Sequence, residues 1–130
     1  MPQGNPIDEY RSAGENIRWY SNIRFAQLTL FVALTALILN RLFPADSSFP
    51  PPYELGLKLI GAVSAIVFGY MELRADEYWT HFMRRAEILE QELGFCQYTT
   101  RPIRRVRTTH LLRAFFLGVF AFWVFTMFVR

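Results

Sequence analysis

The sequence predicts an all-α integral membrane protein, built as a transmembrane helical hairpin with long cytoplasmic helical extensions plus a third transmembrane helix. Hydrophobic residues make up 52% of the 130 residues, and charged residues make up only 19%. The apolar residues fall into three blocks, Phe25–Phe43, Leu55–Met71 and Leu111–Val129, and almost all charge lies between them. None of these blocks has the polar face that a helix on the surface of a soluble protein carries.

The first helix is expected over residues 6–43. Asn5 is a good N-cap, Pro6 suits the first helical position, and the acids Asp8 and Glu9 follow at the positive end of the helix dipole. The apolar part of this helix is about 28 Å long at ~1.5 Å per residue, close to the ~30 Å hydrocarbon core of a bilayer. We therefore expect a cytoplasmic first half and a membrane-spanning second half.

The second helix is expected over residues 55–94. The proline-rich segment 44–54 predicts a short outer turn, since proline interrupts a helix. After the second apolar block, no proline or glycine occurs before Gly94, which suits a C-cap. The cytoplasmic parts of the first and second helices match in length, and we expect them to pair as an antiparallel stalk.

One face of the second helix carries small and apolar residues at coiled-coil spacing. We call this face the seam; it comprises Gly61, Ala65, Phe68, Gly69, Ala75, Trp79, Phe82, Ala86, Leu89 and Leu93. Small residues in a membrane helix allow another helix to approach closely. We expect the seam to join copies of the chain in a homo-oligomer. The alternative is a seam buried within one chain, which would leave a monomer.

Residues 95–110 are expected to form a basic linker, and residues 111–130 a third membrane span. A re-entrant or interfacial helix is the alternative for the third block, because its uninterrupted part is slightly short. The linker carries four candidate lipid- or phosphate-contact residues, Arg101, Arg104, Arg105 and Arg107. We expect them to fix topology and contact membrane lipids. The alternatives are a protein partner or the phosphate of a specific ligand, and no nucleic-acid partner is expected.

Arginine placement predicts the orientation in the membrane. Basic residues are frequent before the first apolar block and between the second and third, whereas the outer turn is flanked only by Arg41 and Lys58. Cytoplasmic segments carry the excess of Lys and Arg in membrane proteins. We expect the N-terminus and the middle segment in the cytoplasm and the C-terminus outside, in the inner membrane of a bacterium.

The sequence offers little for catalysis. Glu77 and His81 are one helical turn apart, but a solvated side-chain pair explains them. The single cysteine, Cys96, rules out an internal disulfide and a cysteine-based metal cluster. We expect no enzyme activity, no catalytic residues, no cofactor and no metal. The candidate pore-lining residues are Gln27, Thr29, Thr35 and Glu72; buried hydrogen bonds between helices are the alternative role for them.

Two stretches carry a resemblance to known proteins: IRWYSNIRFAQLTLF, at the entry to the first span, and EYWTHFMRRAEILEQELGFCQY, after the second. They resemble the small bacterial inner-membrane proteins of the RipA family, which form homo-oligomeric (octameric) assemblies. More distantly, they are similar to the SLATT-type two-span effectors. The first resemblance implies a homo-oligomer, and the second implies a pore-forming effector. The third apolar block departs from the two-span pattern.

Two functions are therefore expected as competing hypotheses. The first is a homo-oligomeric bacterial inner-membrane protein that forms a channel or pore-like assembly. The second is a non-conducting membrane scaffold or adaptor, which recruits a cytoplasmic protein partner through its helical stalk. Exposed aromatic residues Tyr78 and Phe95, with the arginine linker, would form the docking surface of such a scaffold.

Overall fold

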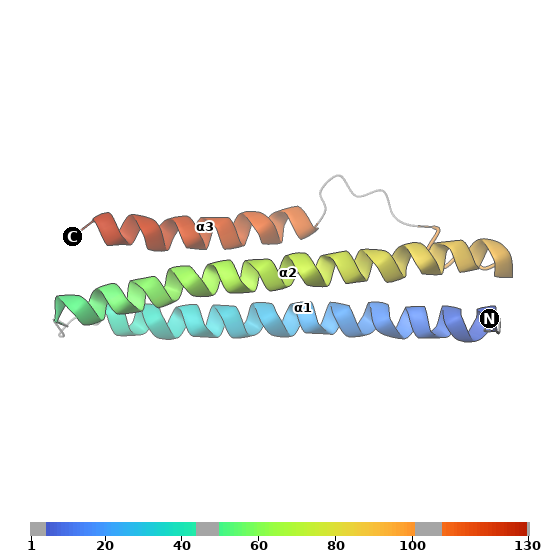
Figure 1. Cartoon of the computed structure of the whole chain (residues 1–130), viewed down its shortest axis with the longest axis horizontal. Helices are drawn as coiled ribbons and strands as arrows, with labels where there is room; N and C mark the ends of the chain where they lie inside the picture. Colours follow the sequence, from blue (N-terminus) through green and yellow to red (C-terminus); the bar gives the residue numbers. More distant parts are fainter. Residues whose placement is uncertain (1–4, 44–49, 101–107, 130) are drawn as a thin grey trace. The chain divides into compact units, whose positions relative to one another are not determined.

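The computed structural model describes residues 5–43, 50–100 and 108–129, and all three of its regular elements are helices (Figure 1). In chain order they are α1 (Pro6–Leu42), α2 (Pro51–Leu93) and α3 (Thr108–Phe128). The described residues contain no β-strand, which confirms the predicted all-α class. All three helices are long and apolar enough to cross a membrane by length and composition.

Helix α1 begins as its sequence predicts. The side-chain carbonyl of Asn5 accepts a hydrogen bond of 3.2 Å from the backbone N–H of Ile7. The backbone carbonyl of Asn5 accepts from the N–H groups of Asp8 and Glu9 at 3.0 and 3.1 Å. These bonds satisfy N–H groups that have no partner inside the helix. At the other end, α1 ends at Leu42, one residue before the predicted boundary.

The predicted start of α2 is wrong by four residues. We expected a turn through residue 54, but α2 begins at Pro51, and the carbonyl of Pro50 accepts from the N–H groups of Tyr53 and Glu54 at 3.0 and 3.4 Å. The prolines do not prevent the helix from starting here, because the first helical turn needs no N–H donors and proline already has a helical φ. Residues 44–49 of the predicted turn lie outside the described residues.

The C-terminal end of α2 confirms the predicted cap. Gly94 has a φ of +74°, in the left-handed region that glycine adopts without steric cost. The carbonyl of Glu90 accepts hydrogen bonds from the N–H groups of Gly94 and Phe95, at 2.8 and 3.1 Å. This geometry ends the helix and turns the chain back over its last turn.

Helix α3 begins at Thr108, three residues before the predicted boundary. The prediction followed the apolar block, whereas the helix starts in the polar residues that precede it. The predicted linker 95–110 is therefore three residues shorter than expected at its C-terminal end. Within it, residues 97–100 form turns and a bend beside the end of α2. Its arginines at 101, 104, 105 and 107 lie outside the described residues.

Contacts divide the chain into two compact units, and α1 and α2 contribute to both. We call residues 5–25 and 73–100 the paired-helix unit. The three-helix unit comprises residues 26–43, 50–72 and 108–129. Each unit has its own apolar core.

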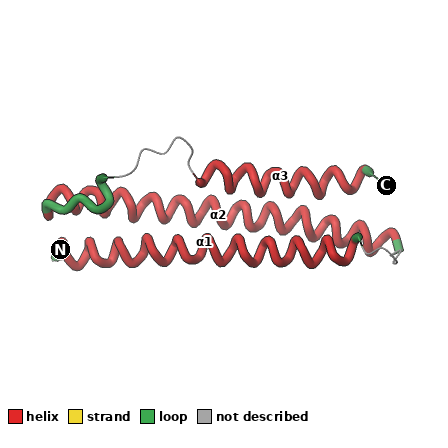
Figure 2. Tube along the Cα trace, turned by 180° about the vertical axis from the view of Figure 1, so that it is seen from behind, coloured by secondary structure: helices red, strands yellow, loops and turns green. Residues whose placement is uncertain are grey.

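The three-helix unit packs α3 antiparallel along α2, with α1 on the same core (Figure 2). Phe31 of α1, Ala65 of α2 and Phe116 of α3 form one buried cluster. A second cluster joins Ile38, Ala62 and Trp123 from the same three helices. Burial of one residue from each helix in each cluster holds the unit together.

The paired-helix unit packs the N-terminal half of α1 antiparallel to the C-terminal half of α2. Its core contains Ala13, Ile17, Met83 and Ala86. An ion pair at each end joins the two helices: Arg85 with Glu9 at 2.7 Å, and Arg24 with Asp76 at 3.4 Å. The partners run in opposite order along the two helices, which confirms the predicted antiparallel pairing.

Candidate docking surface of the paired-helix unit

The seam that we expected between copies of the chain is largely filled within one chain. In the paired-helix unit, Ala75, Ala86 and Leu89 are buried, while Trp79 and Phe82 pack at the edge of the core formed with α1. Leu93 is half-buried. A separate copy cannot reach the buried positions unless α1 leaves them. The α1 segment competes better for this face of α2 than a second copy would, because its place in the same chain gives it a high effective concentration.

The part of the seam that lies in the three-helix unit is covered by α3 and α1. A Cβ added at Gly61 would lie 2.6 Å from Cδ2 of Trp123, so the indole fits only against glycine. A Cβ at Gly69 would lie 3.5 Å from that of Phe116, and Ala65 is buried beside the same ring. The ring of Phe68 lies 5.4 Å from that of Phe31, at an interplanar angle of 48°. The small residues therefore serve close packing inside the three-helix unit.

The predicted pore-lining residues lie on two helices, with Gln27, Thr29 and Thr35 on α1 and Glu72 on α2. Gln27 has a buried side-chain oxygen with no hydrogen-bond partner among the described residues, whereas Thr29 is exposed and Thr35 is half-buried. Residues two apart on a helix point in different directions, which separates Thr29 from Gln27. Glu72 of α2 is buried.

Glu90, a buried acid at the end of α2, is not among the site residues predicted from the sequence. Glu90 has no exposed surface, and its carboxylate accepts hydrogen bonds from the backbone N–H groups of Tyr98 and Thr99, both at 2.8 Å. The hydroxyl of Thr99 also donates to it, and the hydroxyl of Tyr10 donates from α1 at 2.9 Å. We call Glu90 with these partners the Glu90 clamp. It fixes residues 95–100 to both helices.

The Glu90 clamp shifts two pKa values. Burial alone would raise the pKa of Glu90, but the hydrogen bonds from Thr99, Tyr98 and Tyr10 outweigh it and lower the pKa to about 2. Burial raises the pKa of Tyr10 to about 12, together with its hydrogen bond to the Glu90 carboxylate. Both groups therefore keep the charge states that the clamp needs, a carboxylate and a neutral phenol, across the physiological range.

A signal for Glu90 is present in the sequence. An acid in the last turn of a helix lies at the negative end of the helix dipole, which is unfavourable without compensation. The last turn of α2 has no basic residue to offset it. A glutamate four residues before a capping glycine therefore indicates that hydrogen-bond donors from outside the helix contact its carboxylate. The turn after Gly94 supplies these donors.

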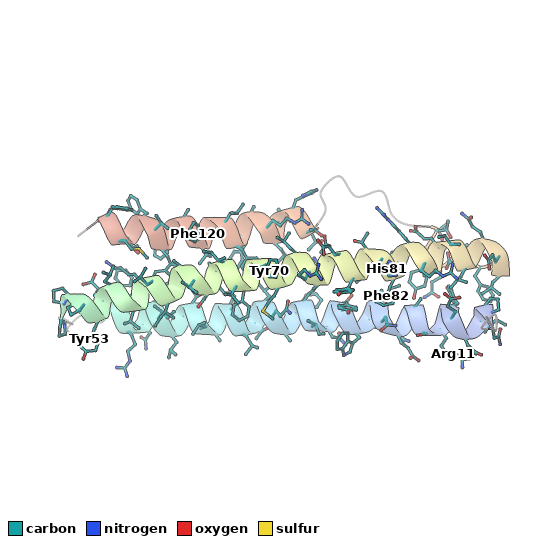
Figure 3. The ribbon with its side chains drawn as sticks, viewed as in Figure 1. Arg11, Tyr53, Tyr70, His81, Phe82 and Phe120 are labelled. Atoms are coloured by element: carbon teal, nitrogen blue, oxygen red, sulfur yellow. The ribbon has the colours of Figure 1, made fainter. Side chains whose placement is uncertain are left out.

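Four aromatic side chains from the two helices of this unit are in contact with one another. The Tyr20 ring lies 5.4 Å from that of Tyr78 at an interplanar angle of 10°, and 5.8 Å from that of Phe82 at 25°. Trp19 meets Tyr20 edge-on at 4.9 Å. We call Trp19, Tyr20, Tyr78 and Phe82 the aromatic ladder, and Phe82 is visible between α2 and α1 in Figure 3.

The aromatic ladder is partly open to its surroundings. Trp19 is 57% exposed and Tyr78 is 44% exposed, and the ring of each contacts the ring of Tyr20. The guanidinium of Arg74 lies 5.5 Å from the centre of the Tyr78 ring, and it pairs with Glu77 at 2.9 Å. Fixed Trp and Tyr side chains beside an arginine are the composition of binding hot spots in protein interfaces.

Phe95, His81 and Glu77, which the sequence suggested as docking or catalytic candidates, lie apart from the aromatic ladder or at its edge. Phe95, expected in a docking surface, is 51% exposed and lies 5.6 Å from Tyr10, ring to ring. His81 is exposed with its ring 5.4 Å from Phe82, while Glu77 is engaged by Arg74. Within the described ranges, no group of three His, Cys, Asp or Glu side chains is placed to hold a metal ion.

The fold and the composition of its helices define the class: an all-α protein with three helices able to span a membrane. Comparison with known protein families, with curated proteins and with solved structures finds no match to the chain.

Proposed function

We propose that this chain is a multi-pass protein of the bacterial inner membrane that acts as a non-conducting scaffold. The three-helix unit anchors it, with the N-terminus in the cytoplasm. The paired-helix unit binds a cytoplasmic protein partner through the aromatic ladder. The proposal includes no catalytic step and no cofactor.

One observation carries the proposal. The face of α2 that a coiled-coil partner would need is filled by α1, while the aromatic ladder leaves Trp19 and Tyr78 exposed. Large aromatic side chains that are both exposed and held rigid lose little entropy when a partner covers them. Such a surface supports binding of another protein more than it supports further assembly through the seam.

Recruitment is tested with the full-length protein in lipid nanodiscs, incubated with cytoplasmic extract. We expect the wild type to retain a discrete partner and the double variant Trp19→Ser with Tyr78→Ser to lose it. Ile88→Ser is the matched control, because Ile88 is 48% exposed on the same unit but outside the ladder. Retention of the same proteins by all three forms would refute the ladder as the docking surface.

The native Cys96 provides a test of orientation. It is the only cysteine, and it is exposed in the paired-helix unit. A membrane-impermeant maleimide should leave Cys96 unlabelled in intact spheroplasts and label it after lysis. Labelling in intact spheroplasts would place the paired-helix unit outside and overturn the proposed topology.

A homo-oligomeric channel is the second candidate, and the sequence resemblance to octameric inner-membrane proteins favours it. Light scattering in detergent measures the mass, and planar-bilayer recording measures conductance. Variants of seam residues such as Ala65→Leu or Leu89→Glu would not test an interface between copies, because both residues are buried inside the chain and the changes would disturb its own packing. Trp19→Ser and Tyr78→Ser test such an interface better, because both side chains are exposed. A multimer with steady conductance would replace the scaffold proposal.

A further inference from the structure

The three-helix unit has a shallow groove along α2 that begins beside the last turn of α1. Its first part is lined by Arg41, Tyr53, Gly56 and Ile60, among others. Ile60 also belongs to a second groove, which continues past Val63 toward the middle of α2. We call the two together the α2 groove. It is lined by apolar side chains except at the Arg41 end and at Ser64.

Positive charge is concentrated at one end of the α2 groove. Arg41 is exposed and makes no ion pair within the described ranges. The nearby acid Glu54 forms an ion pair with Lys58 at 2.6 Å. The ammonium of Lys58 also donates a hydrogen bond to the carbonyl of Thr126 at 2.7 Å. Tyr53 is exposed at the start of α2 (Figure 3). A tyrosine hydroxyl can serve as a second hydrogen-bond donor there.

The groove is long enough for an acyl chain. Its lining residues on α2 run from Pro52 to Phe68, which is 16 positions along the helix. At ~1.5 Å per residue this is about 24 Å, whereas one leaflet of the ~30 Å hydrocarbon core is about 15 Å deep. A cation and a phenol at one end of an apolar groove of this length complement a phospholipid with a negatively charged headgroup.

We propose that the α2 groove binds one anionic phospholipid. The headgroup phosphate lies on Arg41 and Tyr53, and an acyl chain follows Gly56, Ile60 and Val63. Gly56 keeps the channel open because it has no side chain. The proposal rests on the proposed membrane location of the three-helix unit.

The experiment is native mass spectrometry of the full chain in detergent, titrated with phosphatidylglycerol or with neutral phosphatidylcholine. For the wild type we expect one bound lipid and about a fivefold preference for phosphatidylglycerol, since one arginine near a headgroup contributes ~1 kcal/mol. Arg41→Gln should bind both lipids equally. Gly56→Leu should lower the binding of both lipids, because the added side chain fills the channel.

Gly118→Leu is the matched control for Gly56→Leu. An added Cβ meets nothing within 4 Å at either glycine, so both variants should fold, but Gly118 lies on α3 and outside the groove. The control should bind lipid like the wild type. Equal lipid binding by the two leucine variants would overturn the site, and an unchanged lipid preference in Arg41→Gln would do so independently.

A second copy is the competing occupant of the groove. A dimer that carries no lipid and separates in Gly56→Leu would overturn the lipid proposal in favour of self-association. Extraction by alkaline carbonate tests the membrane location separately. Release of the protein into the soluble fraction would refute the proposed function, whereas retention without lipid preference would refute the lipid site alone.

Discussion

The hydroxyl of Tyr10, on the first helix, donates a 2.9 Å hydrogen bond to the buried carboxylate of Glu90, 80 positions later in the chain. The same carboxylate holds the backbone of Tyr98 and Thr99. One acid therefore ties together two helices and the turn that follows the second. The stability of this turn should depend on Glu90 more than on any apolar contact in it.

Removing the phenol hydroxyl should loosen the turn. We expect Tyr10→Phe to lower the free energy of opening residues 95–100 by about 1.5–3 kcal/mol, the usual range for a hydrogen bond to a charged group. Hydrogen exchange at the amides of Tyr98 and Thr99 measures this, and Glu90→Ala should accelerate exchange further. Tyr53→Phe is the control, since Tyr53 is exposed on the other unit. Equal exchange in Tyr10→Phe and wild type would contradict the clamp.

The clamp should persist over a wide pH range. The pKa of Glu90 in the folded state, about 2, is below its ordinary value of 4.5, so its stabilisation is present above pH 4.5 and is lost as the pH falls toward 2. The pKa of Tyr10 is raised from 10 to about 12, so its contribution is complete below pH 10 and is lost as the pH rises toward 12. Exchange at Tyr98 measured against pH should be accelerated only outside these limits, after correction for intrinsic rates. Opening of the turn between pH 5 and 9 would refute this assignment.

The Trp123 site should reject any side chain at residue 61. Gly61→Ala would bring its Cβ to 2.8 Å from the indole nitrogen, and we expect a loss of about 1–3 kcal/mol from overpacking. Gly118→Ala should be neutral or stabilising, because its Cβ meets open space and alanine favours helices. Thermal unfolding in detergent compares the two. Adding Trp123→Leu should suppress the defect of Gly61→Ala, and additive effects would argue against the contact.

Lys58 should hold the end of α3. Its ammonium donates to the carbonyl of Thr126 and pairs with Glu54, so Lys58→Met leaves both acceptors without that partner. We expect a loss of about 1–3 kcal/mol and faster amide exchange in the last turn of α3. Glu54→Gln, which keeps the bond to Thr126, should have the smaller effect. An equal effect of both changes would mean that the ion pair, and not the carbonyl, carries the stabilisation.

The helices were predictable because their signals are local. The apolar blocks, the Asn5 cap and the Gly94 cap each act within a few residues, and all of them appear in the structure. The start of α2 lies four residues before the predicted one, because the prolines of segment 44–54 interrupt a helix in its interior but not in its first turn. The same residues are well suited to a first helical turn, as Pro51 demonstrates.

The partners of each helix face were less predictable, because spacing shows that a face is buried but not what covers it. Ala86 and Leu89 have the spacing of a coiled coil, and that pattern is the same whether the covering helix belongs to this chain or to another. Glu90 was missed for a related reason. Its partners, Tyr10 and Thr99, are brought to it by tertiary folding, so its own neighbours in sequence give only an indirect signal.

Trp123 against Gly61 also fixes the axial position of α3 on α2. Sliding one helix past the other by one turn, about 5.4 Å, would place the indole opposite Leu57 or Ala65, where a side chain occupies the space. The same slide would separate Lys58 from the carbonyl of Thr126. The three-helix unit therefore has one favoured register, and a piston-like stroke of α3 along α2 would have to break both contacts at once.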